Sequence, residues 1–167
     1  VGMHAVLDWF DRHKGEHGLP ERLPYWLNAD WCPQWDRGQV PGWRDQPSAI
    51  ICSQYLRALE QVAQLEEALG NTAQSQALQS EASQVRQAIH RLFWSPEQGL
   101  FADCPDHASF SQYANAWVVC AAVADPAQGA RMLERFPHDP VLAPASFFGM
   151  HFVMQALARL GDRTSVV

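Results

Sequence analysis

The sequence of 167 residues lacks the common signatures of several catalytic classes. It contains no HExxH or CxxC pattern, and its seven histidines are scattered, so we expect no metal site. It also contains no Walker loop, no GxGxxG and no GxSxG, which argues against nucleotide-dependent and serine-hydrolase chemistry. The sequence therefore predicts neither a metal nor a cofactor.

Basic residues are also scarce, and long apolar runs are absent. The chain has 12 Lys and Arg against 18 Asp and Glu, a net charge of −6, and no basic cluster. We therefore expect neither nucleic acid nor an anionic membrane as a partner. No apolar run approaches the length of a membrane span. Of only four cysteines, Cys52 and Cys120 lie in apolar helical stretches and are expected to be buried thiols, which favours a reducing, cytoplasmic location.

Strand-like alternation is rare, and almost every periodic segment is helical. Asp45 is a candidate N-cap for the first long helix, with Pro47 in its first turn, and Gly70 is typical of the residue that ends such a helix. The Gly-Asn junction between two long helices indicates an αα-hairpin. Leu100 to Ala102 form a candidate short strand after a Pro-Glu-Gln-Gly turn. The expected helices cover residues 3–13, 47–69, 71–94, 111–122, 126–136 and 146–160.

Repeated helical hairpins predict an all-α fold, either an α-solenoid or an α/α barrel. The hairpins are irregular in length and show no fixed repeat period. The connections between them are elaborate, which a plain scaffold repeat would not need. We therefore expect residues 1–167 to form a single helical domain of the barrel type.

What the sequence does have is a concentration of tryptophan. Four of its seven tryptophans lie in residues 25–43, among prolines, glycines and charged side chains. Indole faces pack against the C–H faces of sugars, and carboxylates accept hydrogen bonds from hydroxyl groups, so this segment predicts a sugar site on a loop. The alternative is a hydrophobic plug between helices. Both interpretations remain open from this segment alone.

Several motifs in order resemble bacterial α-L-rhamnosidases of glycoside hydrolase family 78, which are six-hairpin glycosidases. The first is Asn-Ala-Asp-Trp at residues 28–31, followed by Pro-Ser-Ala-Ile-Ile-Cys-Ser-Gln-Tyr-Leu-Arg-Ala-Leu at 47–59 and Leu-Glu-Glu-Ala-Leu-Gly-Asn at 65–71. The segment Phe-Trp-Ser-Pro-Glu-Gln-Gly-Leu-Phe-Ala-Asp then ends at residue 103, and Ser-Gln-Tyr-Ala-Asn-Ala follows at 111–116. The resemblance covers most of the chain.

The resemblance implies helical hairpins that form part of an (α/α)6 toroid and inverting hydrolysis of terminal rhamnosides. In that reaction one carboxylic acid protonates the leaving oxygen, and a carboxylate about 6.5–9.5 Å away activates water. The family's general acid lies in an acidic motif upstream of the Asp-Trp loop, and its general base lies in a Trp-Glu segment after the helix matching 146–160. We find neither motif in this sequence. We therefore expect the middle portion of a catalytic barrel, inactive as this chain alone.

By the same resemblance, we expect five residues to bind the rhamnoside. Asp30 and Trp31 match the Asp-Trp of the family's sugar pocket, and Trp35 follows on the same loop. Gln112 and Asn115 lie on the first turn of an expected inner helix. For Asp30 the alternative is a cap on a local turn, and for Gln112 and Asn115 it is ordinary capping polarity.

Two other function classes remain open. One is a non-catalytic helical module that binds a protein through the tryptophans, and the other is a different α/α-barrel sugar enzyme, an epimerase or lyase. Asp103 is expected to orient its loop and not to touch a ligand. If the chain covers only part of a toroid, the end at Phe147 and Phe148 and the helix 111–122 would expose apolar surface, which predicts a homo-oligomer or marginal stability.

Overall fold

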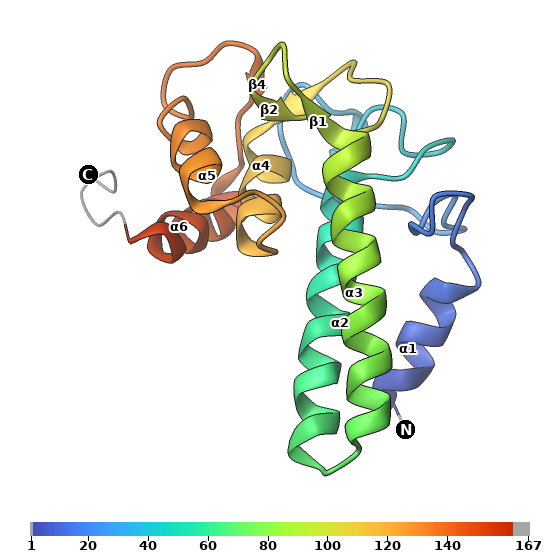
Figure 1. Ribbon diagram of the computed structural model, residues 1–167. Helices are drawn as coiled ribbons and strands as arrows, with labels where there is room; N and C mark the ends of the chain where they lie inside the picture. The colour runs from blue at the N-terminus through green and yellow to red at the C-terminus, as the bar shows by residue number, and fades with distance from the viewer. Residues whose placement is uncertain (1, 162–167) are drawn as a thin grey trace.

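The computed structural model describes residues 2–161 and is built mainly from α-helices (Figure 1). Within these residues the predicted all-α fold is confirmed, and the strands are only two residues long. The elements are α1 (Gly2–Asp11), the 3-10 helix η1 (Asp36–Gly38), α2 (Ala49–Ala68), α3 (Thr72–Phe93), β1 (Trp94–Ser95), β2 (Leu100–Phe101), β3 (Phe110–Ser111), α4 (Gln112–Cys120), α5 (Pro126–Leu133), β4 (Leu142–Ala143) and α6 (Phe147–Leu160).

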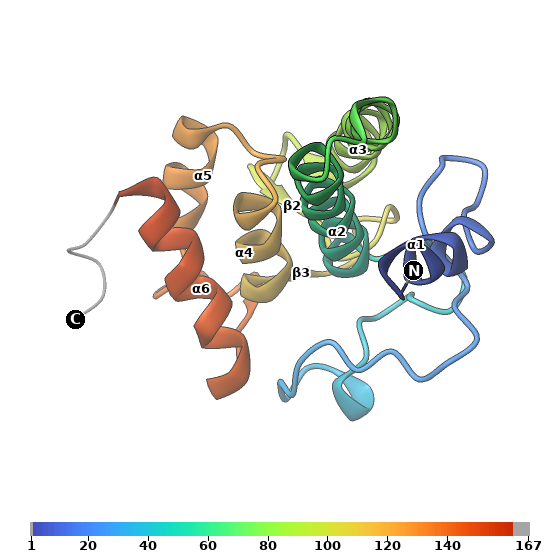
Figure 2. The ribbon, with the colours of Figure 1, turned by 90° about the horizontal axis from the view of Figure 1, so that it is seen from below.

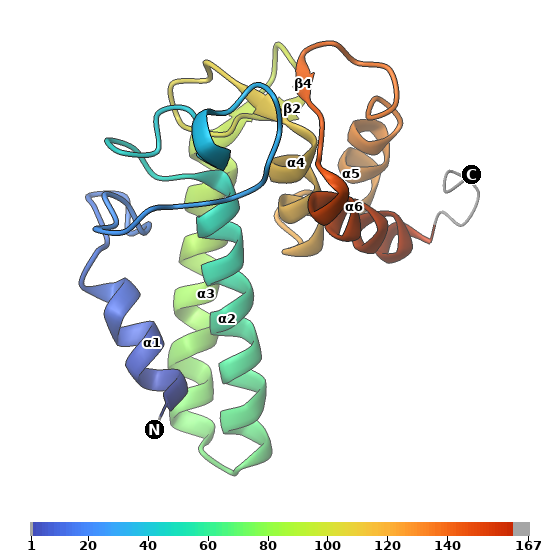
Figure 3. The same cartoon turned by 180° about the vertical axis from the view of Figure 1, so that it is seen from behind.

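The helices form two layers. Seen along the long hairpin, α2, α4 and α6 lie side by side in one layer. Helices α3 and α5 form the second layer, which lies above the first in this view (Figure 2). The predicted hairpin of α2 and α3 is confirmed, and Gly70 lies between them with a φ of +82°, a left-handed conformation that glycine adopts without strain. Helix α1 packs against α2. The long connection from α1 to α2 crosses one end of the hairpin, near the strands (Figure 3).

The short strands lie near the residues at which α2, α4 and α6 begin. β1 pairs antiparallel with β2, which confirms the strand predicted at Leu100, and β3 pairs in parallel with β4. The Asp103 carbonyl after β2 accepts the Ala49 N–H at the start of α2, at 2.9 Å. Asp45 was predicted to cap α2, and this is wrong because Ser48 occupies the N-cap position. Pro47 was predicted in the first turn, and this is also wrong, because Pro47 precedes the N-cap and α2 begins at Ala49.

The core lies between the two layers, and α4 is at its centre. Seven of the nine residues of α4 are buried, because α2 and α6 flank it and α5 covers its back. The prediction that this helix exposes an apolar face is therefore wrong. The same prediction is confirmed for Phe147 and Phe148 at the start of α6, which are 98% and 61% exposed. Cys52 and Cys120 are buried, as predicted.

Candidate functional site

The tryptophan loop, residues 25–43, is fastened to the start of α6 by one buried carboxylate. Asp30 is only 1% exposed. Its Oδ2 accepts the backbone N–H of Ser146 at 2.8 Å, and its Oδ1 accepts the Ser146 hydroxyl and the Trp31 N–H. Ser146 is the N-cap of α6, so Asp30 joins two segments that are 116 residues apart. Both oxygens of this carboxylate are bonded within the protein.

Two glycines allow the backbone to approach Asp30 closely. A Cβ atom at Gly149 would lie 2.3 Å from the Asp30 Oδ2, so any side chain there would displace the carboxylate. Gly38 has a φ of +71°, and a Cβ atom there would lie 2.9 Å from the Asp30 carbonyl oxygen. The Gly38 carbonyl accepts the Ala29 N–H at 2.8 Å, which closes the loop on itself. These contacts therefore fix the backbone of the loop and, with it, the positions from which its side chains project.

The four tryptophans of this loop fall into two pairs. Trp35 and Trp43 are buried in the core, as the hydrophobic-plug interpretation expects. Trp26 and Trp31 are 57% and 61% exposed. The two exposed rings meet edge to face, with centroids 6.2 Å apart and an interplanar angle of 73°. The pair offers two exposed indoles at the surface, next to the anchored start of α6.

A hollow of about 580 Å³ adjoins this pair, because Trp26 is also part of its wall. Its aromatic walls carry three charged side chains, Asp36, Arg37 and Arg44, all exposed. The Arg44 guanidinium lies 4.9 Å from the centre of the Trp43 ring. The lining residues are Leu23, Pro24, Tyr25, Trp26, Asp36, Arg37, Gln39, Trp43 and Arg44. The sequence did not single out Tyr25, Gln39 or Arg44: the first two lie within the tryptophan-rich segment 25–43, and Arg44 follows it directly.

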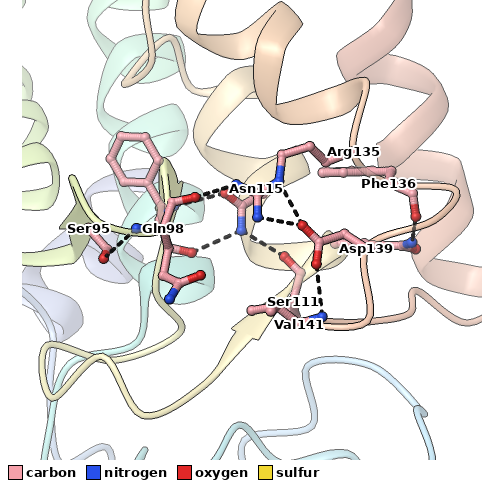
Figure 4. A network of polar contacts seen from close by, with 10 residues as sticks. Ser95, Gln98, Ser111, Asn115, Arg135, Phe136, Asp139 and Val141 are labelled. Atoms are coloured by element: carbon pink, nitrogen blue, oxygen red, sulfur yellow. Dashed lines mark hydrogen bonds and ion pairs between the residues drawn. The ribbon is translucent and has the colours of Figure 1, made fainter.

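The two polar residues predicted on α4 are bonded within the protein, and Figure 4 shows the contacts of Asn115. Asn115 is fully buried, accepts the Phe101 N–H at 2.9 Å, and donates to the carbonyls of Phe101 at 2.9 Å and Ser111 at 2.8 Å. Gln112 donates to the Phe136 carbonyl at 2.7 Å and accepts the Ala145 N–H at 2.9 Å. These contacts tie β2 and the segments before and after β4 to α4.

Asp103 is a second buried carboxyl group. Its side chain is fully buried, and its Oδ1 accepts the Ser111 hydroxyl at 2.5 Å. Its Oδ2 has no hydrogen-bond partner. Burial raises the pKa of Asp103 to about 6. Its backbone links Ala49 and Ser109, which agrees with the expected role of orienting this loop.

Residues 2–161 contain no group of three or more His, Cys, Asp or Glu side chains arranged to hold a metal ion. Across the same part of the chain, no helix combines the length and apolar character that a membrane span requires.

The family model that matches this chain is described as the bacterial α-L-rhamnosidase six-hairpin glycosidase domain, and it covers residues 2–167. The chain belongs to this family. The predicted family and the predicted fold, part of an α/α toroid, are confirmed. A search of curated proteins found no match.

Two solved rhamnosidases have the same fold as this domain. One is the family 78 rhamnosidase of Bacillus sp. GL1, with a TM-score of 0.81 and 20% sequence identity. The other is a rhamnosidase from Klebsiella oxytoca with rhamnose bound, with a TM-score of 0.79 and 16% identity. Each alignment covers 97% of this chain, but only 17% of the Bacillus chain and 30% of the Klebsiella chain. The domain described here thus spans less than a third of either rhamnosidase.

Proposed function

We propose that this chain forms part of the catalytic ring of an α-L-rhamnosidase and that its tryptophan loop binds a terminal rhamnose. The observation that carries the proposal is the exposed pair of Trp26 and Trp31, held on a loop that Asp30 ties to α6. Family membership supports a carbohydrate ligand over the protein-binding module and over the epimerase or lyase.

Rhamnose suits an indole surface because its C6 is a methyl group and its ring carries C–H faces. Such apolar faces pack on aromatic rings, while a few polar groups fix the orientation of the ligand. Among the five residues selected from the sequence, we assign the direct contact to Trp31. Asp30 acts through Trp31 by fixing its backbone, and Trp35 supports the loop from the core. Gln112 and Asn115 hold the neighbouring segments of the ring and do not contact the sugar.

The reaction proposed for the whole enzyme is inverting hydrolysis. It needs a general acid and a general base about 6.5–9.5 Å apart, with room for a water molecule between the base and the sugar. Asp30 is the carboxylate nearest Trp31 in sequence, and it is occupied by Ser146 and by the Trp31 N–H. Because the sequence also lacks both acidic motifs that the resemblance implies, we assign the catalytic pair to residues outside 2–161. This chain alone is expected to bind rhamnose and not to hydrolyse rhamnosides.

Saturation-transfer NMR with rhamnose tests the proposal. Rhamnose should receive saturation from the chain, most strongly at its methyl group, and Trp31→Ala should abolish the transfer. The matched control is Leu69→Ala, which removes another exposed apolar side chain at the far end of the α2–α3 hairpin and should leave the transfer intact (Figure 1). Undiminished transfer in Trp31→Ala would rule out this site. Turnover of a nitrophenyl rhamnoside by the chain alone would contradict the assignment of the catalytic pair.

A further inference from the structure

We propose that the hollow beside Trp26 binds a carboxylate-bearing sugar, a uronate, linked to the terminal rhamnose. This inference rests on the proposed function and names the class of substrate that the same surface would select. Trp26 belongs both to the exposed indole pair and to the wall of the hollow, so the two surfaces are continuous. Adjacent residues of one saccharide chain would therefore occupy both.

The charge of the hollow favours an anion. It holds two guanidinium groups, Arg37 and Arg44, and one carboxylate, Asp36, in a chain that as a whole carries more acidic than basic residues. Among the described residues, none of these three side chains takes part in an ion pair. Arginine is suited to carboxylates because its planar guanidinium can donate two parallel hydrogen bonds.

The backbone at Arg37 adds an independent observation. Its φ of +51° and ψ of +35° lie in the left-handed region, which side chains other than glycine and asparagine rarely adopt. Residues held in such conformations concentrate at ligand-binding positions. The following Gly38 is fixed by the backbone around Asp30, so the arginine is carried on a rigid turn at the rim of the hollow.

The aromatic lining identifies the anion as a sugar acid. Tyr25 and Trp26 are 70% and 57% exposed and offer aromatic surface to the C–H face of a pyranose ring, and Gln39 supplies an amide for hydroxyl groups. Trp43 is buried and supports Arg44, whose guanidinium lies over its ring. A volume of about 580 Å³ is within the usual size of small-ligand sites, roughly 300–1,000 Å³. A phosphate would use the guanidinium groups but not the aromatic walls, whereas a uronate uses both.

Isothermal titration of the full chain with two disaccharides tests the inference. The probes are rhamnosyl-glucuronate and rhamnosyl-glucose with the same linkage. They differ only at C6 of the second sugar, which is a carboxylate in one and a hydroxymethyl group in the other. We expect the uronate to bind about tenfold more tightly at low salt, as for a charged hydrogen bond. Because the hollow is open to solvent, the preference should shrink to about twofold at 1 M NaCl.

Variants separate this effect from the overall charge of the protein. Arg37→Gln with Arg44→Gln should remove the preference, so that the variant binds the two disaccharides with equal affinity. The control is Arg12→Gln with Arg91→Gln, which removes the same charge from exposed positions on other parts of the chain and should keep the preference. Equal binding of both disaccharides by the unmodified chain, or a preference that persists in the Arg37 and Arg44 variant, would overturn the inference while the proposed function stands. Binding of neither disaccharide would overturn both.

Discussion

Gln112 and Asn115 of α4 were predicted as sugar contacts together with Trp31 of the loop, but the structure treats the two groups differently. Asn115 is buried, and its side chain makes three hydrogen bonds to the chain itself. Trp26 and Trp31 remain open to solvent on an anchored loop. Polarity at the start of an inner helix therefore serves the architecture, because buried backbone groups at strand ends need partners. The surface left free for a ligand is aromatic.

The most direct test of this difference replaces two tryptophans of the same loop, one at a time, by alanine. Trp35→Ala should lower the free energy of unfolding by about 3–5 kcal/mol, because it opens a cavity where a buried indole packed. Trp31→Ala should change it by less than about 0.5 kcal/mol, since the side chain is largely exposed. Urea denaturation followed by circular dichroism measures both. Equal losses would mean that Trp31 is part of the core and would remove the basis for assigning it to a ligand.

Asn115→Leu should have the next largest effect. It removes three hydrogen bonds and leaves the Phe101 N–H and carbonyl buried without partners, at a cost of about 3–4 kcal/mol. The matched control is Gln87→Leu, an exposed amide on α3, which should stay within about 0.5 kcal/mol. Rhamnose binding should persist in Asn115→Leu at a temperature where the variant is folded. Loss of binding by the folded variant would restore Asn115 as a sugar contact.

The limits of the sequence can be seen in the same residues. Apolar periodicity and the Gly-Asn junction were sufficient to predict the α2–α3 hairpin, because both signals are local. The sequence could not separate Trp31 from Trp35, because both lie in one irregular loop and only tertiary packing decides which ring is covered. The bond from Asp30 to Ser146 joins residues 116 positions apart, and no local pattern indicates it. Helix α4 was expected to expose an apolar face because the chain was taken to cover only part of a toroid, but α6, which follows α4 only after a long connection, packs against it.

A third prediction concerns the pH dependence of stability at the buried Asp103. Burial raises the pKa of Asp103 to about 6, well above its value in an unfolded chain. The folded state therefore binds this proton more tightly, and its contribution to stability is complete below about pH 4 and is lost as pH rises through about 6. The loss should amount to about 3 kcal/mol at most. Asp103→Asn should remove this part of the pH dependence between pH 4 and 7, as measured by urea denaturation. An unchanged pH profile in the variant would show that Asp103 does not titrate in this range.

The smallest effect on stability is expected at the start of α6, where an apolar side chain is exposed and packs little against the core. Phe147 is 98% exposed, so Phe147→Ser should change the free energy of unfolding by less than about 0.5 kcal/mol. We still propose that this surface drives self-association of the isolated chain, because Phe148, Met150 and Met154 are exposed on the same helix and apolar patches favour association. Sedimentation velocity should show concentration-dependent association that Phe147→Ser weakens. The control Val6→Ser, at an exposed apolar position on α1, should leave it unchanged. A monomer at all concentrations would mean that the chain tolerates exposed apolar side chains in water. The exposure of Trp26 and Trp31 would then be weaker support for a ligand site.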